Sequence, residues 1–437
     1  MTDILSRGKE YFGVADRLST VPTEILAGLS TFLSLSYIFI VNPAILANAG
    51  MDRSFVLFAT IVASAGATLL MGFWARLPFV VAPGMEMNAY VAFFVVGTLG
   101  FSWQDALGAV FWSGVLCIIV TASRAREKII HAIPDHMKSA LSLSVGVFLA
   151  LVALKVSGVL IYEGVKLRGV ANPFSLPAAA LCIGLVLILL LERLKVRAAV
   201  LIAIVLTSVF CHAVGIGHSD DKPAELSATM LTGIFKMNIG VILEPRIWSV
   251  VLILFLLDFY GSVAKFIGLT SSTNLMASGK LPRMREALYV DGVATVAGAS
   301  LGTTSLITYV ESGVGIGAGG RTGLTAITCG IFMLACFLVA PFLKYVPVLA
   351  TTGALVFVAI KLCPAPQVLK ALPLAHILVM LLMQLAVVAF FAIDKAMLVG
   401  FVAYIILELQ NKRKPSPYLV ASTILLVVGA GLQIMRH

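Results

Sequence analysis

Four polar side chains stand inside stretches of the chain that are otherwise apolar, and their types suit hydrogen bonding to a small ligand. They are Glu86, Asn88, Asp258 and Glu311. Ionisable residues inside membrane spans are costly and usually mark substrate or proton pathways. Carboxylates accept N–H donors through charge-assisted hydrogen bonds, and burial favours their protonated form. These residues therefore indicate binding of a polar small molecule, coupled to a proton.

Three of these residues fall in two segments, 77–90 and 302–323, that resemble each other. Each segment follows a long apolar run, begins with residues of high β-propensity, breaks at glycine or proline, and continues as a short helical pattern carrying an acid. Two interrupted helices in corresponding positions of two halves are the best sequence indication of a transporter's binding site. The run GVGIGAGG neither follows a Rossmann-type strand nor opens a βαβ unit, so it predicts no nucleotide site.

The composition is that of a polytopic membrane protein, which is embedded in the lipid bilayer. Of the 437 residues, 60% are hydrophobic and 12% are charged, with a mean hydropathy of +1.04, whereas soluble domains carry about 25% charged residues. The net charge of +10 is typical of membrane proteins whose cytoplasmic loops are rich in Lys and Arg. The sequence has no basic face with interleaved aromatic residues, so it does not indicate nucleic-acid binding. No HExxH, P-loop, CxxC or CxxH pattern occurs, so we expect no enzyme, metal, cofactor or disulfide.

About fourteen spans follow from a hydropathy window of about 19 residues. In the first half they are 24–46, 55–73, a short segment at 84–98, 105–121, 138–156, 174–191 and 197–214. In the second half they are 247–269, 286–301, a short segment at 311–320, 322–344, 346–361, two crossings within 374–408 broken at Asp394 and Lys395, and 417–434. A 1–22 segment precedes them, and a polar loop, 215–246, separates the halves.

The distribution of Lys and Arg predicts the orientation. These residues follow the fourth, sixth and eighth spans, in sets comprising Arg124, Arg126, Lys128 and Lys138, then Arg193, Lys195 and Arg197, then Lys280, Arg283 and Arg285. Exits from even-numbered spans share one side of the membrane. We therefore expect a multi-pass protein of the cell membrane with a cytoplasmic N-terminus and an external 215–246 loop.

Seven spans in each half, 23–214 and 247–437, make the halves inverted repeats in which the two interrupted segments meet near the midplane. We expect 79–81 and 306–308 to pair as antiparallel strands, because extended backbone at that depth survives only when it is buried and hydrogen-bonded. The short helices that follow present free N–H groups to a shared cavity. Asp291, in a run of small residues, is expected to bond backbone near these strands.

Beyond these patterns, the chain resembles the AzgA-type purine permeases of the nucleobase–cation symporter group, which includes uracil and xanthine permeases. The likeness covers most of the chain and is carried by TEILAGLSTFLSLSYIFIVNPAIL (23–46), VAPGMEMNAYVAF (81–93), HAIPDHMKSALSLSVGVFLALVALK (131–155) and GKLPRMREALYVDGVATVAGASLGTTSLITYVESGVGIGAGGRTGLTA (279–326). The resemblance implies an all-α fold with a core domain of spans 1–4 and 8–11 and a gate domain of spans 5–7 and 12–14. It also implies a homodimer and proton-coupled uptake of adenine, guanine or hypoxanthine.

The resemblance further implies roles for particular residues. Asp258 matches the acid on the eighth span that holds the purine in relatives, Glu311 matches the acid that starts the tenth, and Asn88 matches the asparagine of an NAY motif in the third. A purine offers N–H donors to the carboxylates and acceptors to helix-end N–H groups, and we expect the three residues to face one another. Asp258 or Glu311 is expected to carry the proton. Further candidate contacts, including walls for the flat rings, are Tyr37, Phe79, Met85, Tyr309 and Ser312.

The chain departs from the family pattern at two positions. Relatives usually carry a second acid on the eighth span where this chain has Gly261, and usually carry glycine where it has Glu86. We hypothesise that Glu86 reaches the cavity and alters substrate contacts or proton coupling. The alternative is a structural pair with a basic group such as Lys265, which otherwise reaches the membrane interface. A modified purine, a xanthine-like compound or another heterocycle therefore remains open as substrate.

The expected mechanism is alternating access, in which proton and substrate load from outside, the core moves against the gate, and both leave into the cytoplasm. Another class remains open, an anion transporter or channel of the same fold that binds a small anion at two helix N-termini. The acids at 258 and 311 argue against that class, because they would repel an anion.

Overall fold

The computed structural model describes residues 10–123, 135–163, 166–172, 174–196, 198–216, 231–270, 281–338, 340, 345–364, 366–370, 372–391, 393–412 and 414–434. Several residues used in the sequence argument lie outside the described residues. They are 1–9 of the N-terminal segment, 217–230 of the polar loop, and the basic residues Arg124, Arg126, Lys128, Arg197 and Lys280.

Apart from two short strand pairs, the described chain is predominantly helical. The first half contains α2 (Val21–Leu35), α3 (Ile38–Ala47), α4 (Arg53–Leu70), η1 (Met71–Ala75), β1 (Val81–Pro83), α5 (Met85–Ala89), η2 (Tyr90–Val96), α6 (Trp103–Ala122), α8 (Asp135–Val156), β2 (Leu160–Glu163), β3 (Lys166–Val170), α9 (Leu176–Arg193) and α10 (Ala199–Ala213). The second half contains η4 (Ile239–Leu243), α11 (Ile247–Thr270), α12 (Met284–Leu301), β4 (Leu306–Thr308), α13 (Ser312–Gly317), α14 (Gly323–Ala335), η6 (Cys336–Leu338), η8 (Val348–Thr351), α15 (Thr352–Lys361), α16 (Pro366–Lys370), α17 (Leu374–Phe390), α18 (Ile393–Gln410) and α19 (Pro417–Ile434).

The helices follow the predicted spans closely, which confirms an all-α polytopic fold. Among the described residues, five helical stretches are long and apolar enough to cross a membrane, and shorter apolar helices occupy the other predicted positions. The predicted break at Asp394 and Lys395 was wrong by a few residues. Helix α17 ends before Phe391, whose backbone is left-handed, and α18 already includes both charged residues.

Several of these helices begin at a polar residue whose side chain caps the helix N-terminus. Thr20, Asp52, Ser102, Ser175 and Thr322 each accept a backbone N–H of the first turn of the following helix. Such caps satisfy N–H groups that have no partner within the helix. The caps therefore place helix starts next to the apolar runs that the hydropathy pattern predicts.

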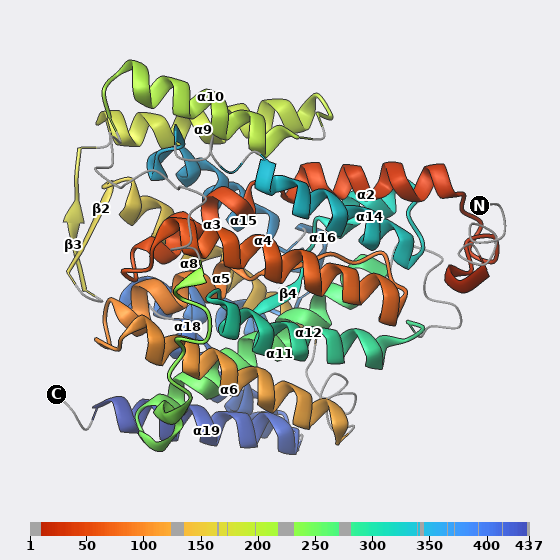
Figure 1. Ribbon diagram of the computed structural model, residues 1–437. Helices are drawn as coiled ribbons and strands as arrows, with labels where there is room; N and C mark the ends of the chain where they lie inside the picture. Colours follow the sequence, from red (N-terminus) through yellow and green to blue (C-terminus); the bar gives the residue numbers. More distant parts are fainter. Residues whose placement is uncertain are drawn as a thin grey trace.

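The helices pack in two groups. The central group comprises α2, α3, α4, β1, α5, α6, α11, α12, β4, α13 and α14, in which α6 packs on α12 and α2 on α14. The flanking group comprises α8, α9, α10, α15, α17, α18 and α19, in which α8 packs on α15 and α17 on α18. In Figure 1, α9 and α10 form one edge of the molecule and α6 and α19 the opposite edge. Contacts of α5 and α11 with α8 link the groups.

The two interrupted segments meet as a buried antiparallel strand pair. Val81 lies opposite Thr308, Ala82 opposite Ile307, and Pro83 opposite Leu306. Strand β4 occupies the predicted residues, whereas β1 begins two residues later than predicted. The expected antiparallel pairing of one segment from each half is thus present, and a short helix, α5 or α13, follows each of the two strands.

Side chains complete the hydrogen bonding of this extended backbone. Thr68 Oγ1 donates to the Val81 carbonyl and accepts the Val81 N–H, both at 3.0 Å. The Val80 N–H donates to Ser312 Oγ at 3.0 Å. Because hydrocarbon offers no hydrogen bonds to backbone, these partners are what allow non-helical chain at this depth. Asp291 accepts a hydrogen bond from the side-chain hydroxyl of Thr308 at 3.3 Å, so it contacts the strand pair.

Candidate functional site

A cavity of about 370 Å³ lies between the two helix groups. The central group contributes Glu86, Leu257, Gly261, Lys265, Leu269 and Val310 to its lining, and the flanking group contributes Leu141, Ser142, Val145, Lys361, Leu362 and Met397. Four of these residues recur at four-residue spacing along α11, which places them on one face of that helix. The size and mostly apolar walls suit a small flat ligand.

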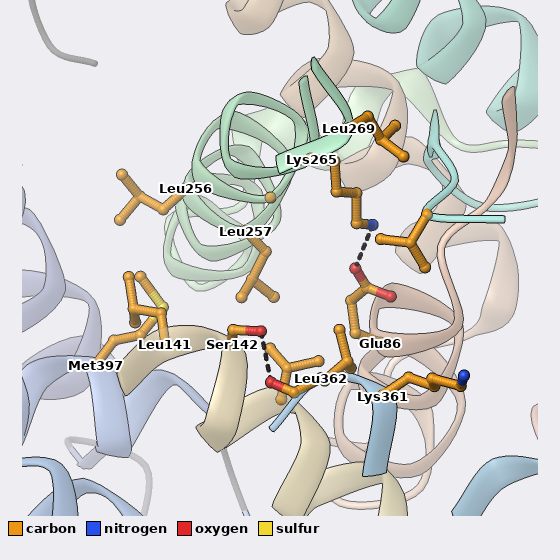
Figure 2. Close-up of a pocket in the computed structure, with 13 residues that line it drawn as sticks. Glu86, Leu141, Ser142, Leu256, Leu257, Lys265, Leu269, Lys361, Leu362 and Met397 are labelled. Atoms are coloured by element: carbon orange, nitrogen blue, oxygen red, sulfur yellow. Dashed lines mark hydrogen bonds and ion pairs between the residues drawn. The ribbon is translucent and has the colours of Figure 1, made fainter. Parts of the chain in front are cut away.

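Two of the charged groups that line this cavity, Glu86 and Lys265, form an ion pair. Lys265 Nζ lies 3.2 Å from Glu86 Oε1, and the two side chains are 13% and 12% exposed. Figure 2 shows them pointing toward each other from α11 and α5. Glu86 therefore reaches the cavity, as hypothesised, and also pairs with Lys265, as the alternative held. Any effect of Glu86 on substrate contacts or proton coupling stays a prediction.

Glu311 lies beside the cavity, next in sequence to the lining residue Val310. Its Oε1 accepts a hydrogen bond from the Tyr37 hydroxyl at 2.8 Å. Its Oε2 is buried and has no hydrogen-bond partner among the described residues. Glu311 also interacts electrostatically with both Lys265 and Glu86. Oε2 of Glu311 is thus an acceptor beside the cavity, and an N–H group of a ligand could donate a hydrogen bond to it.

Asp258 is not among the residues that line this cavity, and a substrate contact for it stays a prediction. The side chain is fully buried and accepts hydrogen bonds from Thr295 Oγ1 at 3.2 Å, Ser305 Oγ at 3.3 Å and Ser262 Oγ at 3.2 Å. Each residue of an α-helix is rotated by about 100° from the previous one, so Asp258 faces α12 and the β4 approach while Leu257 faces the cavity. The structure ties this carboxyl to the strand pair.

Asn88 belongs to a second buried network. Its Nδ2 donates to Asn42 Oδ1 at 2.5 Å, and its Oδ1 accepts from Thr304 Oγ1. Asn42 in turn donates to Thr60 at 2.7 Å and to Thr303 at 3.0 Å. Thr304 is adjacent to Ser305, which donates to Asp258. Asn88 and Asp258 therefore accept hydrogen bonds from neighbouring residues of one segment. Glu311 is not part of either network among the described contacts.

Replacing Asn42 with alanine is expected to destabilise the fold by about 3 kcal/mol, because buried polar partners on Thr60, Asn88 and Thr303 lose their hydrogen bonds. Thermal unfolding of purified protein in detergent measures this change. Asn48→Ala is the matched control, because Asn48 is exposed and bonds only carbonyls of its own helix, Ala44 and Ile45, in the described contacts. Equal stability of the two variants would contradict the expectation.

The remaining predicted contacts divide between the cavity's surroundings and the core. Tyr309 donates to the Pro83 carbonyl at 2.5 Å, and Lys265 Nζ lies 5.9 Å from its ring. Ser312 supports the strand backbone, as described above. Phe79 is buried against Phe266, with ring centroids 5.4 Å apart, and Met85 is buried in the main hydrophobic core. A substrate role for these residues stays a prediction.

The sequence argument did not identify several cavity residues. Leu257 and Leu269 were detectable in principle, because they continue the four-residue spacing of Gly261 and Lys265, which the sequence had already singled out. Leu141, Ser142, Lys361 and Met397, from the flanking group, carried no comparable signal in the sequence. Their place in the lining follows from how the two helix groups meet.

Two half-helices that start from a buried strand pair, beside a cavity between two helix groups of a membrane protein, define a secondary transporter rather than an enzyme. The chain belongs to the permease family, whose pattern matches residues 22–363. It is 36% identical over 346 residues to the adenine permease AdeQ of Escherichia coli K12, covering 78% of this chain and 77% of the relative. It is 32% identical over 411 residues to the guanine/hypoxanthine permease PbuO of Bacillus subtilis 168, covering 91% and 94%.

A solved structure shares this fold. The transmembrane domain of the cyanobacterial bicarbonate transporter BicA superposes with a TM-score of 0.61, at 15% sequence identity, over 88% of this chain and 96% of that domain. At such low identity the likeness concerns the fold alone. The family membership and the shared fold together establish a multi-pass membrane transporter.

Proposed function

We propose that the protein imports a purine nucleobase, or a closely related heterocycle, together with a proton. The relatives named above are adenine and guanine/hypoxanthine permeases, and the cavity has a suitable size and apolar walls. In this proposal the central group acts as the core domain and the flanking group as the gate domain. Movement of one against the other would expose the cavity alternately to the two sides.

The observation that carries the proposal is the buried, unsatisfied Oε2 of Glu311 beside the cavity. A purine ring N–H can donate to this atom, and the hydrogen bond would be charge-assisted while Glu311 is ionised. When Glu311 carries the coupled proton, which burial favours, its O–H can donate to a ring nitrogen or carbonyl of the same bound purine, so proton and substrate are carried together. Asp258 is the second candidate for the proton, through its contact with the strand pair.

The arrangement of basic residues supports a cytoplasmic N-terminus in the cell membrane. Arg17 Nη1 donates to the carbonyls of Arg76 and Arg321, at 3.1 and 2.8 Å, and Arg283 Nη1 donates to the Trp74 carbonyl at 3.0 Å. These four arginines therefore gather at one end of the central group, the end that the positive-inside rule assigns to the cytoplasm. The family resemblance further supports a homodimer.

Thermal unfolding of the purified protein with purines, pyrimidines and small anions, at two pH values, tests the proposal. A purine that binds only the folded state raises the unfolding temperature, corresponding to about 2.7 kcal/mol at a hundredfold excess over Kd. We expect at least one purine to do so and pyrimidines or bicarbonate to do less. Stabilisation by bicarbonate or sulfate, with none by any purine, would instead indicate an anion transporter of the same fold.

A further inference from the structure

The cavity contains a cation whose present partner belongs to the protein itself. Lys265 projects from α11 into the cavity and is held by Glu86 of α5 at 3.2 Å (Figure 2). An ammonium group has three hydrogen-bond donors, and the described contacts of Lys265 use one for Glu86 and place the charge 5.9 Å from the Tyr309 ring. The ammonium therefore retains donor capacity toward the space in which a substrate would lie.

The space beside Lys265 is open. Gly261 lies one helical turn before Lys265 on the same face of α11, and a Cβ placed on Gly261 would meet no atom within 4 Å. A substrate substituent could occupy this space without moving the backbone. Gly261 itself carries no charge, and the nearest charge along this helix face is the Lys265 cation.

The charges around Glu86 come from a defined set of groups. Lys265 faces it from α11, and Tyr309 and Glu311 interact with it from the chain between β4 and α13. Tyr37 interacts with it from the end of α2. The α8 residues that line the cavity, which are Leu141, Ser142 and Val145, carry no charge, and Lys361 of α15 pairs with Glu192 at 3.0 Å. Lys265 is therefore the cation closest to Glu86 among these groups.

We propose that the substrate is a flat heterocycle carrying a negative charge at neutral pH, and that Lys265 binds its anionic group in place of Glu86. Glu86, released from Lys265, then takes up one proton from the aqueous side. The bound anion and the added proton cancel, so the charge of the cavity stays unchanged on loading. The anion meets no more repulsion from Glu311 than the Glu86 carboxylate that it replaces, because Glu311 already interacts with Glu86. The inference rests on the proposed function and specifies the substrate class of that site.

A part-buried ion pair of this kind suits such an exchange. Breaking it without replacement would leave a charge with little solvation and no partner, which is strongly unfavourable. A neutral purine offers Lys265 only a neutral acceptor, whereas an anion offers a charge-assisted bond equivalent to the one it displaces. When no substrate is bound, the Glu86 carboxylate thus makes the ion pair with Lys265 that the anionic group of the substrate would make.

Binding of matched ligand pairs to the purified full-length protein tests the inference. The pairs are urate with hypoxanthine, for a charge on the ring, and purine-6-carboxylate with purine-6-carboxamide, for a charge on a carboxyl substituent. We expect at least one anion to bind more tightly than its neutral partner, and to bind more tightly at mildly acidic than at mildly alkaline pH. The pair in which this preference appears identifies the source of the charge.

Variants then separate Lys265 from general effects on the fold. Lys265→Met is expected to lower the affinity for the anion, relative to its neutral partner, about tenfold or more. Lys265→Arg keeps the cation and is expected to retain the preference. Glu86→Gln removes the competing carboxylate and the proton site, so anion binding is expected to strengthen and to lose its pH dependence. Lys155→Met is the matched control, because Lys155 is also half-buried but lies against Phe93 and Phe391.

The outcomes separate the two proposals. If hypoxanthine or another neutral purine binds and neither anion does, this inference is overturned and the proposed function stands. An unchanged ratio of anion to neutral affinity in Lys265→Met, or a change of equal size in Lys155→Met, also overturns it. If no heterocycle of either charge binds the unmodified protein, the proposed function itself fails.

Discussion

Replacing Glu311 with glutamine is expected to abolish concentrative uptake and to weaken purine binding about tenfold or more. Oε1 of Glu311 accepts the Tyr37 hydroxyl, and Oε2 is buried without a partner in the described part of the chain. A glutamine can still accept from Tyr37, but it cannot bind and release a proton. Uptake of radiolabelled purine into proteoliposomes under an imposed proton gradient measures the effect.

Two comparisons make this result interpretable. Glu244→Gln carries the same chemical change on a partly exposed residue paired with Arg246, and it should leave accumulation unaltered. Asp258→Asn tests the other candidate for the proton, because Asp258 is fully buried among hydroxyl groups next to the strand pair. Accumulation retained by Glu311→Gln would refute the role given to Glu311, and loss in Asp258→Asn alone would transfer that role to Asp258.

Gly323→Ala is expected to destabilise the protein by about 3 kcal/mol or more. Gly323 begins α14 where that helix crosses η1, and a Cβ on it would lie 2.0 Å from the Gly72 carbonyl oxygen and 2.9 Å from the Arg76 Cα. Both are backbone atoms, so no change of rotamer relieves the overlap. Small residues allow such close approach between membrane helices. Thermal unfolding in detergent and the yield of folded protein measure the loss.

Gly66→Ala is the control for this experiment. Gly66 lies within α4, and a Cβ on it would meet no atom within 4 Å. Alanine is the better helix former by about 1 kcal/mol, so Gly66→Ala should be neutral or slightly stabilising. If Gly323→Ala unfolds at the same temperature as Gly66→Ala, the close crossing of α14 over η1 contributes little to stability.

Much of the fold was predictable because a membrane imposes strict conditions on sequence. Helices must be apolar along most of their length, and backbone that leaves a helix must find hydrogen bonds within the protein. The glycine and proline breaks therefore located the strand pair, and β4 lies at the predicted residues. The prediction for β1 stopped before Pro83, but a proline can end an edge strand because its missing N–H is not needed there.

The candidate site was less predictable, because it depends on which helix face meets the gap between two groups. Asp258 was selected for its residue type, yet its neighbour Leu257 faces the cavity and Asp258 faces α12. One position along a helix changes the direction of a side chain by about 100°. The pairing of Glu86 with Lys265 was foreseen only as one alternative, because 179 positions separate the residues.

The strand pair also determines when the site can exist during synthesis. Val80 and Ser312, which bond each other at the start of the pair, are 232 positions apart, so the first half of the chain enters the membrane long before its partner strand is made. During that interval the polar backbone of β1 lacks the partner that hydrocarbon cannot replace. Closing so long a loop comes late in folding. A newly made first half therefore lacks the strand that pairs with β1. If translation stops before β4, the proposed binding site cannot form.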